Sequence, residues 1–278
     1  MDGPALHPAS AIQGSDRPRA DLSVDAAFAV PNNPIMIDPV LFALLLLAAA
    51  ALYAAVGHGG ASAYLALMAL TGFAPEQVRP LALVLNLFVS AIAFIQFRRT
   101  GAFDLRLFAL FAVAAIPMAY LGGSIDLGGT WHRRLLGAVL IASAAALAFR
   151  PRLAETESTP PGPAIALPTG GALGLIAGLT GTGGGIFLSP LLVLMRWAEA
   201  RTVAGISAAF IFCNSAAGLL GQGAQLGSLP PETPLYVGAV VVGGLLGSGL
   251  SATWLPRVAL VRLLALVLVI AGAKLLGT

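Results

Sequence analysis

The sequence predicts an all-α polytopic membrane protein, built from two pseudo-symmetric repeats that the charge pattern favours as inverted. The first observation is composition: 58% of the 278 residues are hydrophobic and 10% are charged, whereas soluble domains carry about 25% charged residues. The second is a series of long apolar segments interrupted by two short ones, and the third is a glycine cluster before each short segment. Together they predict about eight spanning helices and two half-helices after glycine-rich breaks.

Residues 1–35 differ from the rest of the chain, because they hold five Pro among polar residues and show no apolar periodicity. Such a segment buries too little apolar surface to fold, so a disordered N-terminal extension is expected. Met36 stands directly before the first hydrophobic run and is an alternative start of translation. The first transmembrane repeat is expected over 36–149, a polar, proline-rich linker over 150–165, and the second repeat over 166–278.

A membrane crossing needs ~17–25 residues, and most of the apolar segments approach or reach this length. The segment 166–180 is marginal, and the 12-residue segments 61–72 and 186–197 are expected to be half-helices. In chain order, the apolar segments lie at 37–56, 61–72, 80–97, 106–123, 133–149, 166–180, 186–197, 202–221, 234–252 and 258–276.

The two glycine clusters occupy matching places in the two halves. Gly57-His58-Gly59-Gly60 precedes the first half-helix, and Thr180–Gly185, which reads Thr-Gly-Thr-Gly-Gly-Gly, precedes the second. The clusters lie 124 residues apart, and the acidic residues Glu76 and Glu199, which follow the half-helices, lie 123 apart. In lipid, a broken helix persists only where protein or a water-filled cavity satisfies the freed backbone groups. Paired breaks therefore indicate the substrate path of a transporter.

The basic residues of the loops decide between two topologies. If the half-helices are not counted as crossings, the repeats are parallel and the basic residues outside the N-terminal extension divide 6 against 7. If each half-helix reverses the chain direction, the repeats are inverted and the division is 9 against 4. The positive-inside rule favours the inverted arrangement, with the linker in the cytoplasm and both termini outside. The cytoplasmic set is then Arg98, Arg99, Arg106, Arg150, Arg152, Arg196, Arg201, Arg257 and Arg262, and the opposite set is Arg79, Arg133, Arg134 and Lys274.

The second glycine cluster carries a family resemblance. With Ser189-Pro190 after it and Gly205-Ile206-Ser207 opening the next helix, it resembles the sulfite exporter TauE/SafE family of bacterial membrane proteins. The resemblance implies transport of sulfur-containing anions, such as sulfite or sulfonates, across the bacterial inner membrane. The first half departs from the family pattern at His58, Ala61 and Ala66. The matching residues are Gly181, Gly183, Gly184, Gly185, Pro190 and Ser207.

Backbone chemistry explains how glycine breaks could hold an anion. The first turn of a half-helix has unsatisfied N–H groups and about half a positive charge from the helix dipole, so it binds an anion without a buried Lys or Arg. The expected N–H donors lie at Gly183–Phe187 and Gly59–Ala63. The alternative is that the glycines only allow close helix packing. The predicted substrate-binding residues are Gly57, His58, Gly59, Gly60, Ser62, Asn86, Thr180, Gly181, Thr182, Gly183, Gly184, Gly185, Ser189, Ser207 and Asn214, which Ser215 and Gln222 could join.

Ionisable residues limit the coupling mechanisms. His58 is the only ionisable residue inside an uncharged membrane segment; it could bind the anion, carry a proton, or be a neutral side chain bonded to a carbonyl. Arg79 and Arg201, at the entrances of long helices, are interpreted as topology anchors rather than as groups that attract anions. Apart from Asp38, at the very start of the first segment, the predicted spans contain no Asp or Glu. The remaining mechanisms are potential-driven export, coupling through His58, and an ion held by backbone carbonyls at the breaks.

Other classes of function are less well supported. Ser62 and His58 are four residues apart, but the Gly-x-Ser-x-Gly motif of many hydrolases is absent, so an enzyme is not expected. One Cys and one membrane His do not suggest a metal transporter, and no cofactor is expected. Fourteen of the 15 basic residues are Arg in loops, which favours topology over nucleic-acid binding. The expected partners are a small anionic substrate, of sulfur or of another small-anion type, and the lipid bilayer, with homodimerisation left open.

Overall fold

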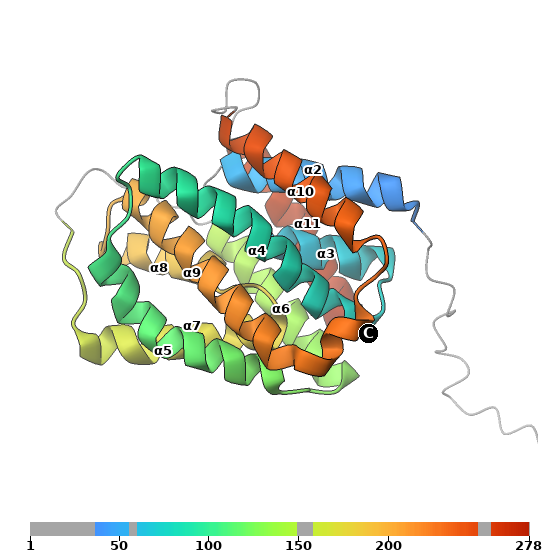
Figure 1. Ribbon diagram of the computed structural model, residues 1–278, viewed down its shortest axis with the longest axis horizontal. Coiled ribbons are helices and arrows are strands. Elements are labelled where there is room, and N and C mark those ends of the chain that lie inside the picture. Colours follow the sequence, from blue (N-terminus) through green and yellow to red (C-terminus); the bar gives the residue numbers. More distant parts are fainter. Residues whose placement is uncertain (1–36, 56–59, 149–157, 250–256, 278) are drawn as a thin grey trace, which may run out of the picture. The chain divides into compact units, whose positions relative to one another are not determined.

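The computed structural model describes residues 37–55, 60–148, 158–249 and 257–277, all within one unit of the chain, Ile35–Thr278. Regular structure in these residues is helical throughout (Figure 1). The predicted extension 1–35, three residues of the first glycine cluster (Gly57, His58 and Gly59) and linker residues 150–157 lie outside the described residues. The helices are α2 (Pro39–Ala55), α3 (Ala61–Thr71), α4 (Pro75–Arg99), α5 (Leu105–Ser124), α6 (Gly129–Ala148), α7 (Pro163–Thr180), α8 (Gly185–Leu194), α9 (Ala200–Gln222), the 3-10 helix η1 (Gly223–Ser228), α10 (Thr233–Gly249) and α11 (Arg257–Gly277).

Each predicted apolar segment corresponds to one of these helices, and the two expected half-helices, α3 and α8, have 11 and 10 residues. Four of the described helices are long and apolar enough to cross a membrane: α4, α5, α7 and most of α9. The marginal segment 166–180 becomes an 18-residue helix, because α7 begins at Pro163. The count of eight spans stays a prediction, since α2 and α10 each have 17 residues.

Local sequence signals fix several helix ends. The carboxylate of Asp38 accepts from the N–H groups of Val40 and Leu41, and Asp104 accepts from Leu107, so both residues cap the first turn of a helix. Proline occupies the first position of α4 and α7, where its missing N–H is not needed. Inside α4, Pro80 cannot donate to the carbonyl of Glu76. The hydroxyl of Ser228 in η1 donates to that carbonyl at 2.9 Å and replaces the lost bond.

Two pairs of helices, each with one helix from either half, pack side by side and run parallel. In the pair α5–α7, Gly170, Gly174 and Gly178 lie against the backbone of Phe111, Ala115 and Ala119, respectively, so closely that a Cβ atom on any of the glycines would overlap it. In the pair α2–α10, Gly243 and Gly247 lie in the same way against the backbone of Leu47 and Ala51. Small residues at such interfaces let the backbones approach closely.

Two further pairs also join a helix of the first half to a helix of the second, and the helices within each pair run antiparallel. In the pair α4–α9, Gly205 lies beside Phe97, whereas Gly218 lies beside Leu83, so the helices run antiparallel. The pair α6–α11 is also antiparallel, because Gly137 contacts Leu276 and Gly272 contacts Ile141. Buried apolar residues form one core among α2, α3, α4, α6, α10 and α11 and a second among α5, α7, α8 and α9.

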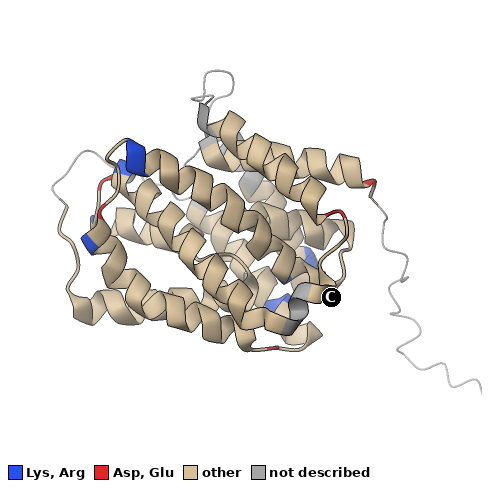
Figure 2. Cartoon of the chain, viewed as in Figure 1, with Lys and Arg blue, Asp and Glu red and all other residues tan. Residues whose placement is uncertain are grey.

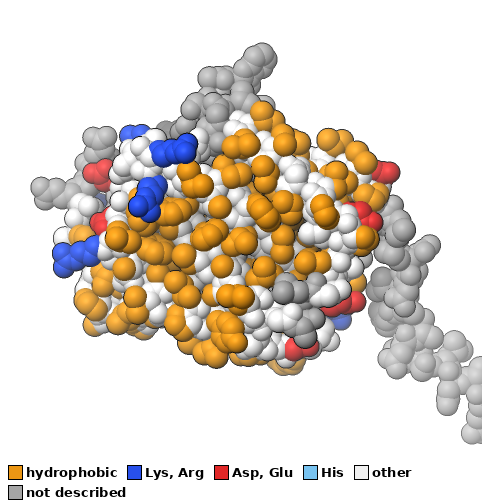
Figure 3. Space-filling view, in the orientation of Figure 1, with side chains coloured by type: hydrophobic (Ala, Val, Ile, Leu, Met, Phe, Trp, Pro, Cys, Tyr) orange, Lys and Arg blue, Asp and Glu red, His pale blue; other side chains and the backbone are white. Residues whose placement is uncertain are grey.

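The outer surface of this unit is apolar between two charged ends. Large hydrophobic side chains such as Val113, Leu220 and Leu245 are exposed. Hydrophobic side chains spread across the middle of the face in Figure 3. Soluble monomers rarely expose so much contiguous apolar surface, so this surface fits a lipid environment. Charged residues gather at the helix ends (Figure 2).

One end, called here the arginine-rich end, comprises the C-terminal ends of α4 and α8 and the N-terminal ends of α5 and α9. Gly205 of α9 contacts Phe97 and Ala102, which places the start of α9 beside the end of α4. At the opposite end, Lys274 donates to the carbonyls of Ala69 and Leu70, just before α4 begins. Basic residues of the arginine-rich end are Arg98, Arg99, Arg106, Arg196 and Arg201, and those of the opposite end are Arg79, Arg133, Arg134 and Lys274.

Candidate functional site

The second glycine cluster forms the turn between α7 and α8. Helix α7 ends at Thr180, and Gly181 follows it in the left-handed conformation with φ of 79°. Gly183 and Gly184 also have positive φ, of 70° and 77°. Residues other than glycine are strained in this region, so the backbone path of the turn requires the glycine-rich sequence.

The same glycines allow close packing against neighbouring helices. A Cβ atom on Gly183 would lie 2.8 Å from Ile211 Cγ2 and 3.0 Å from Ser215 Oγ, both on α9. A Cβ atom on Gly184 would lie 3.0 Å from Phe210 and 3.1 Å from Ala177. The packing role considered from the sequence is therefore present in the structure, and any ligand would have to meet the backbone N–H groups rather than replace a side chain.

Both half-helices begin at a glycine N-cap, and neither has a side-chain cap. In α8 the first hydrogen bonds run from the N–H groups of Phe187 and Leu188 to Gly184 O. In α3 the first between described residues runs from Tyr64 N–H to Gly60 O at 3.1 Å. The N–H groups before these residues precede the helical ladder, and they are the groups that a helix N-terminus offers to an anion.

The hydroxyl groups around the second break bond to the protein itself. Thr180 donates to Ile176 O at 2.7 Å, and its oxygen lies 3.0 Å from that of Thr182. Ser189 hydrogen-bonds to Ser207 at 2.7 Å and lies 2.9 Å from Gly185 O. All four side chains are buried. The structure thus pairs Thr180 with Thr182 at the end of α7 and pairs Ser189 of α8 with Ser207 of α9.

Two side chains of α4 bond to the backbone near the second break. Asn86 donates from Nδ2 to Gly181 O at 3.2 Å and is fully buried. Arg79 is only 4% exposed, and its guanidinium donates to the carbonyls of Gly178, Ile125 and Gly123 at 2.8, 3.0 and 2.6 Å and also to Gly122. Arg79 is therefore a buried residue that bonds to the ends of two helices, which neither interpretation from the sequence included, whereas Arg201 is exposed at the start of α9.

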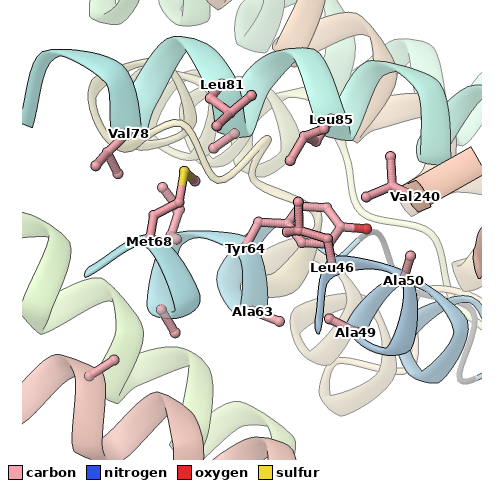
Figure 4. Close-up of a cluster of buried hydrophobic side chains, with 14 of the residues drawn as sticks. Leu46, Ala49, Ala50, Ala63, Tyr64, Met68, Val78, Leu81, Leu85 and Val240 are labelled. Carbon is pink, nitrogen blue, oxygen red and sulfur yellow. The ribbon is translucent and has the colours of Figure 1, made fainter. Parts of the chain in front are cut away.

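The first break is described from Gly60 onward. Ser62, in the first turn of α3, lies 2.7 Å from the hydroxyl of Tyr53 on α2. Tyr64 is fully buried, and its hydroxyl has no hydrogen-bond partner in the structure. In Figure 4 the Tyr64 ring lies among Leu46 and Ala50 of α2, Leu85 of α4 and Val240 of α10. Tyr64 is not among the substrate-binding residues predicted from the sequence.

Comparison with known proteins now identifies the family. The model of the family described as sulfite exporter TauE/SafE matches residues 41–275, a range that includes both glycine breaks and all the helices from α2 to α11 except the first residues of α2 and the last residues of α11. The chain belongs to the sulfite exporter TauE/SafE family. It is also 39% identical, over 229 residues, to a Sinorhizobium fredii protein named "Probable membrane transporter protein y4hK", with 81% of this chain and 92% of the relative covered. No solved structure matches the chain.

This TauE/SafE chain is a multi-pass membrane transporter, and several of its buried polar side chains have no hydrogen-bond partner among the described residues. Asn214 of α9 has no partner for either side-chain atom, and neither do Gln222 and the hydroxyl of Ser215. All three residues are at least nine-tenths buried. Ser215 faces Gly183, as the close approach of its oxygen to that residue shows. Unpartnered buried polar groups lower stability, so polar side chains at these positions call for an explanation beyond the fold.

Proposed function

We propose that this transporter carries small sulfur-containing anions, such as sulfite or sulfonates, across the bacterial inner membrane. The anion is held at the first turns of α3 and α8, near the middle of the bilayer. The observation that carries the proposal is the pairing of a glycine N-cap that lacks a side-chain cap with a buried, unpartnered polar side chain. Gly60 is paired with Tyr64, and the break at Gly183–Gly184 is paired with Ser215.

We also infer that the two halves are inverted repeats, α2–α6 and α7–α11. Exchanging the halves converts the α5–α7 pair into the α10–α2 pair. In each of these two pairs the helices run parallel to each other. The pairs α4–α9 and α6–α11 convert into themselves, and both are antiparallel. An in-plane two-fold axis requires this combination. The arginine-rich end would then face the cytoplasm.

The described helices offer no buried carboxylate, which agrees with potential-driven transport as the simplest mechanism. A −1 anion that leaves a cell across about 100 mV gains ~2.3 kcal/mol, which corresponds to roughly 50-fold accumulation outside. Donors without a fixed positive side chain suit this task, because a substrate bound too tightly would leave slowly.

Flux measurements in proteoliposomes test the proposal. Uptake of sulfite, thiosulfate and methanesulfonate is expected to exceed that of empty liposomes and to respond to an imposed membrane potential. Transport of other small anions but of none of these would contradict the sulfur-anion assignment.

Two further variants test whether Ser215 belongs to the anion site. Ser215→Ala should lower the flux, because it removes the unpartnered hydroxyl beside Gly183. Ser143→Ala is a matched control, because Ser143 is equally buried and bonds to Val139 O in its own helix. Equal flux in the two variants would contradict a role of Ser215 in the site.

A further inference from the structure

We propose that the hydroxyl of Tyr64 is a substrate ligand at the first break and the side-chain donor that gives the first half-helix its affinity for a sulfur oxyanion. This inference rests on the proposed function and assigns a residue to it.

The position of Tyr64 places its hydroxyl at the start of its own helix. Tyr64 lies four residues after the N-cap Gly60, and long helical side chains point back toward the N-terminus. A Cβ atom on Gly60 would overlap the Tyr64 ring and hydroxyl. The hydroxyl therefore occupies the space beside Gly60 that any other residue type at that position would fill.

The bonding state of Tyr64 differs from that of the neighbouring tyrosine. The hydroxyl of Tyr53 lies 2.7 Å from Ser62 Oγ. The hydroxyl of Tyr64 is fully buried and has no partner in the structure. A buried phenol without a hydrogen-bond partner makes the folded protein less stable than a phenylalanine in the same place would. A ligand that accepts a hydrogen bond from it would account for a tyrosine at this position.

The backbone donors of the same turn indicate the charge of the ligand. The N–H groups of Ala61, Ser62 and Ala63 precede the first hydrogen bond of α3, which Tyr64 N–H donates to Gly60 O. These groups and the phenol are donors, and the helix dipole adds positive potential. The described carboxylates lie at or beyond the helix ends, away from this turn. An oxyanion with several acceptor oxygens fits this set, and a cation does not.

The second half has no phenol at the equivalent position. Leu188 lies four residues after the N-cap Gly184, which is the place that Tyr64 has relative to Gly60. Leu188 is fully buried and apolar. Of the hydroxyls near that break, those of Thr180, Thr182, Ser189 and Ser207 bond within the protein, and the unpartnered hydroxyl of Ser215 comes from the neighbouring helix α9 rather than from α8 itself. The two half-helices are therefore chemically unequal, and the phenol donor belongs to the first alone.

Tyr64→Phe tests the assignment, because it removes one oxygen and keeps the ring. In proteoliposomes, the KM for the transported sulfur anion should rise about 10- to 100-fold, as expected for a lost hydrogen bond to a charged group. In detergent, the rise in Tm that sulfite or methanesulfonate gives the wild-type protein should shrink or vanish in the variant. Sodium chloride at equal ionic strength controls for salt.

Tyr53→Phe is the matched control. It removes a buried hydroxyl that already has a partner, so it should lower the Tm without ligand and leave KM within about twofold. The inference is overturned if Tyr64→Phe keeps the KM and the ligand-induced Tm rise of the wild type, or if no anion raises the Tm of the wild type. If the wild type transports only anions without sulfur and Tyr64→Phe raises their KM, the sulfur assignment fails while the role of Tyr64 stands.

Discussion

The guanidinium of Arg79 donates from Nε to the backbone carbonyl of Gly178 at 2.8 Å. This contact joins α4 of the first half to the last turn of α7, directly before the second glycine break. The remaining donors of the same side chain reach Gly122, Gly123 and Ile125 at the end of α5. The carbonyls at the C-terminal ends of helices lack intrahelical partners and carry partial negative charge, so one arginine caps two helices at once.

Replacement of Arg79 should therefore weaken the fold. Arg79→Met keeps an unbranched side chain but leaves four carbonyls without this donor, three of them in buried hydrogen bonds. We expect a loss of about 3 kcal/mol or more, equivalent to a fall in Tm of roughly 6–12 °C, measured by thermal unfolding in detergent. Arg79→Lys should recover only part of this loss, because an ammonium lacks the planar fork that reaches several acceptors.

Arg99→Met provides the comparison for this prediction, because Arg99 is exposed at the C-terminal end of α4. Its Tm should change by less than about 2 °C. Equal effects of the two substitutions would contradict the capping role of Arg79.

Glycine substitution separates backbone strain from packing at the second break. Gly184 and Gly101 have φ of +77° and +71°, but only Gly184 has neighbours where a Cβ atom would stand. Gly101→Ala should lower stability by about 1 kcal/mol from strain alone. Gly184→Ala should lower it by a further ~1–3 kcal/mol, because the methyl group meets Phe210 and Ala177. Equal changes in chemical unfolding would exclude the packing contribution.

Much of this architecture was predictable from hydrophobicity and glycine placement alone. The apolar segments located the helices, and the glycine clusters located both half-helices, because lipid requires long apolar runs and only glycine tolerates the turn at Gly181–Gly184. The start of α7 was predicted three residues late. An apolar count does not register a helix start that is set by Gly162 at the N-cap and Pro163 at the first position.

The roles of Arg79 and Tyr64 were not predictable in the same way. Arg79 is followed by Pro80, which indicates a helix start and says nothing of the ends of α5 and α7, which tertiary packing brings to its side. Tyr64 looks like an ordinary core aromatic in the sequence, because only the structure shows that its hydroxyl lacks a partner. Sequence periodicity records which residues are apolar, whereas hydrogen-bond partners depend on contacts between distant segments.

Accessibility of introduced cysteines tests the inverted topology. Thr100→Cys and Glu199→Cys place thiols at exposed positions of the arginine-rich end, and Thr130→Cys places one at an exposed position of the opposite end. In a Cys213→Ala background, a membrane-impermeant maleimide should label intact cells only at position 130. Positions 100 and 199 should react after the cells are opened. Labelling of 100 and 199 on opposite sides of the membrane would instead support parallel repeats.

The two asparagines of the central helices should respond differently to the same change. Asn86 donates to Gly181 O at 3.2 Å, whereas Asn214 has no partner for its side chain. Leucine has a similarly branched shape and no polar atom, so Asn214→Leu removes an unsatisfied buried amide. We expect its Tm to be unchanged or higher and its anion flux to fall severalfold, because the ligand loses a polar contact.

Asn86→Leu should instead lower the Tm, because the carbonyl of Gly181 loses its donor and the turn loses its link to α4. Thermal unfolding and proteoliposome flux, measured on both variants, separate the two effects. If Asn214→Leu kept full flux, the unpartnered amide would have no part in transport. If it lowered the Tm as much as Asn86→Leu, its role would be structural, since an amide that bonds only to a passing anion contributes nothing to the stability of the empty protein.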